Sequence, residues 1–242
     1  MKRPARVPAQ LSESLHKRLN SYALAASAAG VGALALAQPV AAKIIYTKTH
    51  QVINTGQVYK IDLDNDGVPD FQLSNMDNSN FANLAVCPAN PKSCVYRSSS
   101  GTANEVWGKP HKDQSHWAWS YASAVPFGFR IGPNKKHFQV RDSSMLGISC
   151  TSQSCKSWGP WKGAATNRYL GFKFSIKGRT HYGWARLSVG ERGVHITATL
   201  TGYAYETIPN KPIIAGKTHG KNEATLGRLA QGASAVSNGG KP

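Results

Sequence analysis

Strict alternation of apolar and polar residues in the C-terminal third most constrains the fold of this chain. Apolar side chains recur at every second position in 170–176 and in 194–200, and Lys177-Gly178 supplies a tight turn before 182–189. A period of two places the apolar side chains on one face of a strand, so these segments predict half-buried antiparallel strands. No segment after residue 42 sustains a helical period of 3.6. The pattern predicts an all-β protein.

The absence of an internal repeat argues against a propeller, which needs several similar blades. A single antiparallel β-sandwich-like domain over residues 43–216 is the better prediction. The remaining residues, 217–242, are rich in Gly, Ala, Ser, Asn and Lys, which predicts a flexible C-terminal tail.

The first 42 residues have the pattern of an export signal. A basic leader is followed by an Ala-rich apolar run over 22–37 and by Val40-Ala41-Ala42, after which we expect cleavage. An uncleaved anchor is the alternative, but the run is shorter than the ~20 residues of a spanning helix. We therefore expect a helical signal peptide over 1–42, membrane contact only through it, and a secreted, periplasmic or cell-surface location.

An acidic loop interrupts the apolar alternation in the first part of the predicted domain. Asp62, Asp64, Asp66 and Asp70 all lie at even positions, with Gly67 between them to permit a turn. Calcium takes six to eight oxygen ligands, and such a loop directs carboxylates towards one centre. The loop therefore predicts a calcium site with these four side chains and the Val68 carbonyl as ligands.

The acidic loop differs from two other kinds of acidic turn. It is not an EF-hand, because the twelfth loop position is Leu73 and the flanking segments are strands. A solvated acidic turn is possible in principle, but four convergent carboxylates repel one another, which favours a bound cation. Extracellular calcium sites bind at roughly 0.1–1 mM, which suits a structural role rather than a catalytic one.

Four cysteines fit an oxidising compartment. Six residues, with turn formers among them, separate Cys87 from Cys94, and four residues separate Cys150 from Cys155. Three connectivities are possible, and the two local disulfides are favoured because turns bring each pair together. A zinc site is disfavoured because its cysteines are usually spaced by two.

The segment 74–132 loses clear periodicity, so we expect long irregular loops with short strands there. Long loops inside a compact domain tend to be functional. This segment contains the densest group of interaction-capable side chains, and the candidate ligand-binding residues are Trp107, His111, His116, Trp117 and Trp119.

Two activities could use these residues. Tryptophans form platforms for sugar rings, and Trp158 with Trp161 is a second possible platform, although tryptophan more often belongs to the core. His111, Asp113 and His116 could act as acid and base in a hydrolase, although their spacing matches no known signature.

The charge balance is basic, with 29 Lys and Arg against 12 Asp and Glu. Such a surface attracts nucleic acids or acidic polymers. Because export removes the chain from nucleic acids, acidic glycans of the envelope or of the extracellular space are the expected partners.

The acidic loop matches the pattern D-x-[DN]-x-D-G-x-x-D at every defined position, and so resembles the calcium loops of FG-GAP and VCBS-type secreted proteins. The segments 169–174, 180–186, 202–206 and 212–216 resemble the C-terminal half of exported bacterial β-rich proteins of the PEP-CTERM-associated type. The tail departs from that type, since 225–232 has no spanning apolar helix. The resemblance implies aspartate-bound calcium and an envelope or secreted location, and it implies no activity.

Together these features predict an exported, calcium-stabilised β domain with a surface-binding or envelope-structural role and no catalytic activity. The alternatives are a carbohydrate-binding module that uses the loop tryptophans and a secreted hydrolase.

Overall fold

A computed structural model describes residues 43–89, 94, 104–112, 118–133, 137–139 and 142–220. The predicted signal peptide lies outside these ranges, as do residues 221–242 of the predicted tail. All regular secondary structure in the described ranges is β-strand, which confirms the predicted all-β class. No helix long and apolar enough to cross a membrane is present in this part of the chain.

The described residues form fourteen strands. These are β1 (Ile44–Ile53), β2 (Val58–Ile61), β3 (Phe71–Asn78), β4 (Phe81–Pro88), β5 (Glu105–Lys112), β6 (Ala118–Ala122), β7 (Arg130–Ile131), β8 (Phe138–Gln139), β9 (Ser143–Cys150), β10 (Cys155–Trp158), β11 (Arg168–Ile176), β12 (Arg179–Arg192), β13 (His195–Glu206) and β14 (Ile213–Ile214).

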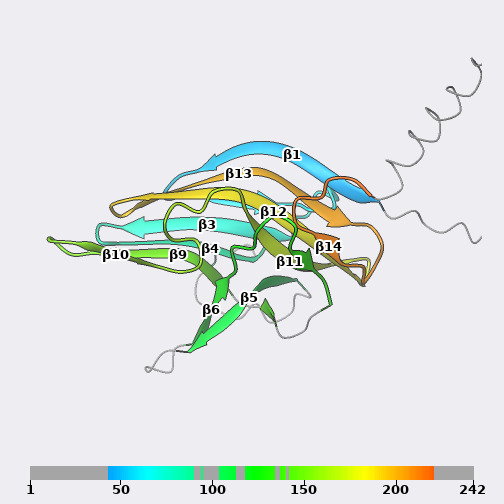
Figure 1. Ribbon diagram of the computed structural model, residues 1–242. Coiled ribbons are helices and arrows are strands. Elements are labelled where there is room, and N and C mark those ends of the chain that lie inside the picture. Colours follow the sequence, from blue (N-terminus) through cyan, green and yellow to red (C-terminus); the bar gives the residue numbers. More distant parts are fainter. Residues whose placement is uncertain are drawn as a thin grey trace, which may run out of the picture. The chain divides into compact units, whose positions relative to one another are not determined.

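The strands of the domain form two facing layers. Hydrogen-bonded neighbours follow the order β1-β13-β12-β11-β5-β6-β9-β4-β3-β2, with β10 beside β9 and β8 beside β5. The strands β1, β13 and β12 lie over β3, β4 and β9 (Figure 1), and β13 contacts both β3 and β4. The predicted sandwich-like arrangement is therefore present.

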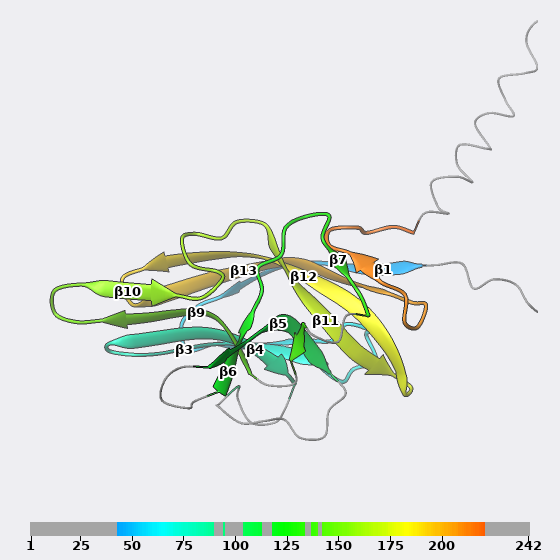
Figure 2. The ribbon, with the colours of Figure 1, turned by 60° about the horizontal axis from the view of Figure 1, so that its bottom comes forward.

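Strands β5 and β6 lie where the two layers join (Figure 2). β5 pairs with β11 in one layer and with β6 in the other, so a single strand passes from one layer to the next. β6 then runs parallel to β9 over two residue pairs. This short parallel ladder is the one departure from antiparallel pairing among the described strands.

The hairpin of β11 and β12 forms as the sequence pattern predicts. Ile176 pairs with Arg179, and the two turn residues Lys177 and Gly178 both have positive φ, 49° and 75°. This geometry matches the twist of antiparallel strands. Along β13, buried and more exposed residues alternate from His195 to Leu200, as expected for a half-buried strand.

The segment 74–132 contains longer strands than the sequence pattern predicts. β3 and β4 form a hairpin with eight residue pairs, and β5 is eight residues long. The periodicity is obscured because Gln72, Ser74 and Asn75 are polar and yet buried in β3. A buried polar residue imitates a loop residue when only the pattern is considered.

Most of the buried apolar residues belong to two clusters. The larger fills the space between them, where the rings of Phe71 and Phe172 stack with centroids 4.2 Å apart. The smaller cluster includes Trp107, Tyr182 and Trp184 and contains residues of the segment 125–138 and of β14. The segment 125–138 and β14 therefore pack against part of the β11–β12–β13 layer.

Both predicted local disulfides are present. Cys87 and Cys94 are bonded, as are Cys150 and Cys155, which face each other across β9 and β10. None of the four cysteines is free to bind zinc.

Candidate metal centre and binding cavity

The acidic loop is the tip of the β2–β3 hairpin. Ile61 pairs with Phe71 at the base of the loop, and the amide N–H of Asp70 donates to the Ile61 carbonyl at 2.9 Å. Ile61, Leu63, Phe71 and Leu73 are all buried in the main core. The alternation of the sequence thus anchors the loop on both sides, because its apolar residues point inwards.

Three of the four predicted carboxylates converge. One oxygen from each of Asp62, Asp64 and Asp70 lies within 4.8 Å of the others, and all three residues are half-buried. Backbone donors hold two of them in place: the N–H of Gly67 donates to Asp62 Oδ2 at 2.8 Å, and the N–H of Leu63 donates to Asp70 Oδ2 at 2.8 Å. We refer to Asp62, Asp64 and Asp70 as the carboxylate cluster.

The other two predicted ligands lie in the same loop. Asp66 is exposed, and its Oδ1 accepts the N–H of Val68 at 2.8 Å, which closes a local turn. Val68 is 66% exposed at the tip. Gly67 has a φ of +89°, a conformation that glycine adopts without strain. The structure does not bring the carboxylate of Asp66 into the cluster.

The carboxylate cluster is electrostatically unfavourable by itself. Burial raises the pKa of Asp70 to about 7, the N–H of Leu63 partly opposes this, and the charges of Asp64, Asp62 and Asp66 raise it further. Burial also raises the pKa of Asp64, with a further contribution from the charge of Asp66. A cation among these oxygens would remove the repulsion.

Residues from distant strands support the cluster. Asn104 Nδ2 donates to the backbone carbonyl of Asp70 at 3.2 Å, while Asn104 Oδ1 accepts the N–H of Ser175 in β11 at 3.2 Å. Burial raises the pKa of Tyr205, and the negative charges of Asp64 and Asp70 raise it further. The pKa of Tyr203 is also raised, first by burial and then by neighbouring charges. Sequence reasoning missed these supports because the fold alone brings them to the loop.

The candidate ligand residues of the middle segment belong to a hairpin. His111 in β5 and Trp119 in β6 are directly paired along the backbone. Asp113, His116 and Trp117 lie outside the described residues, so the predicted acid–base set is not placed. The irregular loop expected here is, in its described part, two paired strands.

Neither Trp158 nor Trp161 offers an open sugar platform. Trp161 is fully buried, and its indole N–H donates to the Ala122 carbonyl at 3.0 Å. Trp158 is half-buried beside Phe81, at 6.0 Å between ring centroids, and covers Gly147 so closely that a Cβ there would lie 2.4 Å from its ring. Trp161 is therefore a core residue, as tryptophan more often is, and not part of a binding platform.

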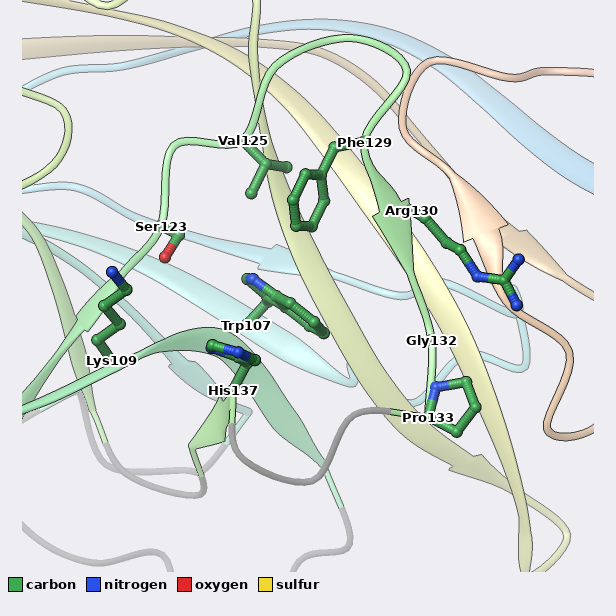
Figure 3. Close-up of a pocket in the computed structure, with 9 residues that line it drawn as sticks. All are labelled: Trp107, Lys109, Ser123, Val125, Phe129, Arg130, Gly132, Pro133 and His137. Carbon is green, nitrogen blue, oxygen red and sulfur yellow. The ribbon is translucent and has the colours of Figure 1, made fainter.

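Trp107 lines a cavity of about 550 Å³, which we call the Trp107 cavity (Figure 3). Trp107 is itself only 7% exposed, with His137 stacked on it at 5.0 Å and Phe129 edge-on at 5.5 Å. The described residues that line it are Trp107, Lys109, Ser123, Val125, Phe129, Arg130, Gly132, Pro133 and His137. Sequence reasoning found Trp107 but not its neighbours, which come from other segments.

The chain matches no protein-family model, no curated protein and no solved structure.

Proposed function

We propose that this protein is exported and forms a calcium-stabilised β domain with a non-catalytic role in surface binding or envelope structure. The observation that carries the calcium proposal is the convergence of Asp62, Asp64 and Asp70 within 4.8 Å in a loop anchored by buried residues. The export-type leader and the resemblance of the loop to FG-GAP and VCBS-type calcium loops support it.

The donor set fits calcium better than softer metals. All three side chains are carboxylates, which are hard oxygen ligands, and no His or Cys joins them in the described part of the chain. Calcium takes more than three oxygens, so backbone carbonyls and water would supply the rest. Because these residues connect β2–β3 to β11 through Asn104, a bound ion would fasten the hairpin to the opposite layer.

Calcium is expected to raise the melting temperature of the wild-type protein by about 3–10 °C. At about 10 mM calcium, a site of roughly 0.1–1 mM affinity adds about 1.4–2.7 kcal/mol to the free energy of unfolding. A domain of this size gains about 2–4 °C per kcal/mol. Calorimetry in calcium, in magnesium and in chelator measures the shift, and magnesium is expected to produce a smaller one.

Two variants locate the effect. Asp64→Asn removes one charge of the carboxylate cluster and is expected to lose most of the calcium shift. Asp77→Asn, at the other end of β3, is the control and is expected to keep it. An unchanged melting temperature of the wild type in calcium, or an equal loss in both variants, would count against a calcium site at this loop.

In chelator, the free energy of unfolding is expected to fall as the pH rises from about 5 to about 7.5. Asp70 has a folded-state pKa of about 7, whereas an unfolded aspartate has a pKa of about 3.9. The folded protein therefore binds more protons over this interval, so stability present below the unfolded pKa is lost as pH rises through the folded pKa. Urea denaturation at several pH values measures the trend.

Calcium is expected to oppose this trend, because the ion binds the deprotonated carboxylates. Asp70→Asn is the control, since it removes the titrating group and keeps an oxygen towards the Leu63 N–H. A chelated wild type whose pH dependence equals that of Asp70→Asn would refute the assignment to Asp70.

The carbohydrate-binding alternative has one specific observation in its favour, the Trp107 cavity. No observation on the described residues favours the hydrolase alternative, so it is not proposed.

A further inference from the structure

Polar groups gather on one side of the Trp107 cavity. Trp107 and Lys109 are two residues apart in β5, and both line the cavity. The N–H of Ser123 donates to the Trp107 carbonyl at 3.0 Å, which brings Ser123 alongside. Figure 3 shows the Lys109 amine, the Ser123 hydroxyl and the nitrogen-bearing edge of the Trp107 indole on the same side. Three hydrogen-bond donors therefore face one part of the cavity.

These donors are available to a ligand. Within the described residues, the Lys109 amine, the Ser123 hydroxyl and the Trp107 indole N–H have no hydrogen-bond or ion-pair partner. Two other lysines of the domain are paired, Lys173 with Glu105 and Lys211 with Glu206. Donors left without partners beside a cavity indicate a place where a ligand supplies the acceptors.

The charge around the cavity is positive. Among the described residues, its lining contains Lys109 and Arg130 but neither Asp nor Glu. Arg130 lies at the rim, and its guanidinium points away from Trp107 (Figure 3). A concave site lined by one sign of charge concentrates ligands of the opposite sign. The cavity therefore favours an anion, whose charge Lys109 would contact directly.

The remaining wall of the cavity is apolar. Val125, Phe129 and Pro133 form this wall. A nucleic-acid base would need an open aromatic face on which to stack. Trp107 offers none, because His137 covers one face at 5.0 Å and the residue is only 7% exposed. A sugar ring, which has apolar C–H faces and hydroxyl groups, fits this mixture of an apolar wall and hydrogen-bond donors.

The volume also fits a small ligand. About 550 Å³ lies within the range of roughly 300–1,000 Å³ that is usual for small-molecule sites. A longer polymer could place one acidic residue in the cavity and continue past the rim at Arg130.

We propose that the Trp107 cavity binds an acidic sugar residue of an extracellular or envelope glycan. The carboxylate of the sugar accepts hydrogen bonds from Lys109 and from the neighbouring donors of Ser123 and Trp107, and its ring lies against Phe129. This inference rests on the proposed surface-binding role and names its ligand class, but it does not require the calcium site.

The test is a calorimetric titration of the purified protein with a galacturonic acid oligomer. The methyl-esterified form of the same oligomer is the matched neutral ligand, because esterification removes the charge and keeps the ring. The acid form is expected to bind at least about tenfold more tightly than the ester, because a hydrogen bond to a charged group contributes that much to the affinity. Equal binding of both forms, or no binding of the acid form, would overturn the proposal, as would tighter binding of a single-stranded DNA oligonucleotide.

Two charge reversals test the place of binding. Lys109→Glu is expected to weaken binding by about tenfold or more. Lys156→Glu, on β10 and equally exposed, changes the net charge by the same amount and is expected to weaken binding less than about threefold. Ser123→Ala provides a milder second variant, and near-ultraviolet circular dichroism verifies the fold of each. Equal losses in the two reversals, or none in Lys109→Glu, would refute the assignment to this cavity.

The titrations are run both in calcium and in chelator, with the fold verified in each. Loss of the calcium-dependent melting shift with glycan binding intact counts against the metal proposal alone. Absent glycan binding in both conditions, with the melting shift intact, counts against the cavity alone.

Discussion

Replacing Trp161 with alanine is expected to lower the free energy of unfolding by about 3–5 kcal/mol. Trp161 is fully buried in the main core, so the substitution leaves a large cavity between the layers. It also removes the indole N–H that donates to the Ala122 carbonyl at 3.0 Å at the end of β6. Since domains are stable by only about 5–15 kcal/mol, this loss is a large part of the total. Urea denaturation followed by far-ultraviolet circular dichroism measures it.

Two further variants separate the contributions at this position. Trp161→Phe keeps most of the apolar volume but leaves the Ala122 carbonyl without its donor, so we expect a smaller loss of about 1–3 kcal/mol. Trp158→Ala is the matched control, because Trp158 is only half-buried in the neighbouring strand β10 and should cost less. Equal losses in Trp161→Ala and Trp158→Ala would contradict the core role of Trp161.

The parts of the fold that the sequence predicted are those in which neighbours in the chain decide the structure. The β11–β12 turn needs only Lys177-Gly178, and each disulfide closes a short loop. The acidic hairpin is equally local, since Ile61 pairs with Phe71 across its own loop. In each case the pattern of turn formers and alternating residues contains the information needed.

The parts that could not be predicted depend on contacts between distant segments. Asn104 reaches Asp70 and Ser175 only because β5 passes between the layers. The Trp107 cavity needs Ser123 and His137 from separate segments. Even within the acidic loop, the pattern predicted four carboxylate ligands, whereas the structure brings together those of Asp62, Asp64 and Asp70 and leaves Asp66 outside the cluster. Sequence spacing shows which carboxylates are near one another but not which of them converge.

β3 shows how tertiary hydrogen bonds conceal a strand. Asn75 is fully buried, and its side chain has partners far away in the chain. Such a residue lowers the apolar content of a strand without exposing it to water, because the two hydrogen bonds from Nδ2 offset part of the cost of burial, while Oδ1 has no partner among the described residues. The same arrangement makes Asn75 important for stability.

Replacing Asn75 with leucine is expected to lower the free energy of unfolding by about 2–5 kcal/mol. Asn75 Nδ2 donates to the carbonyl of Ile53 at 3.2 Å and to that of Ile196 at 2.7 Å. Its amide thus connects β3 with the end of β1 and the start of β13, beside the turn that joins β1 to β2. Leucine has a similar size but no donor, so two carbonyls would lose a buried partner, at about 1–3 kcal/mol each.

Ser74→Ala is the matched control for this prediction. Ser74 neighbours Asn75 in the same strand and is equally buried, but its hydroxyl has no hydrogen-bond partner among the described residues. Removing that hydroxyl should change the free energy of unfolding by less than about 1 kcal/mol, because no hydrogen bond is lost. Urea denaturation compares the two variants, and hydrogen exchange of the β1 amides shows whether Asn75→Leu loosens this edge of the sheet. If the two substitutions cost the same, the hydrogen bonds from Asn75 do not stabilise the contact between the layers, and burial alone accounts for its position in the core.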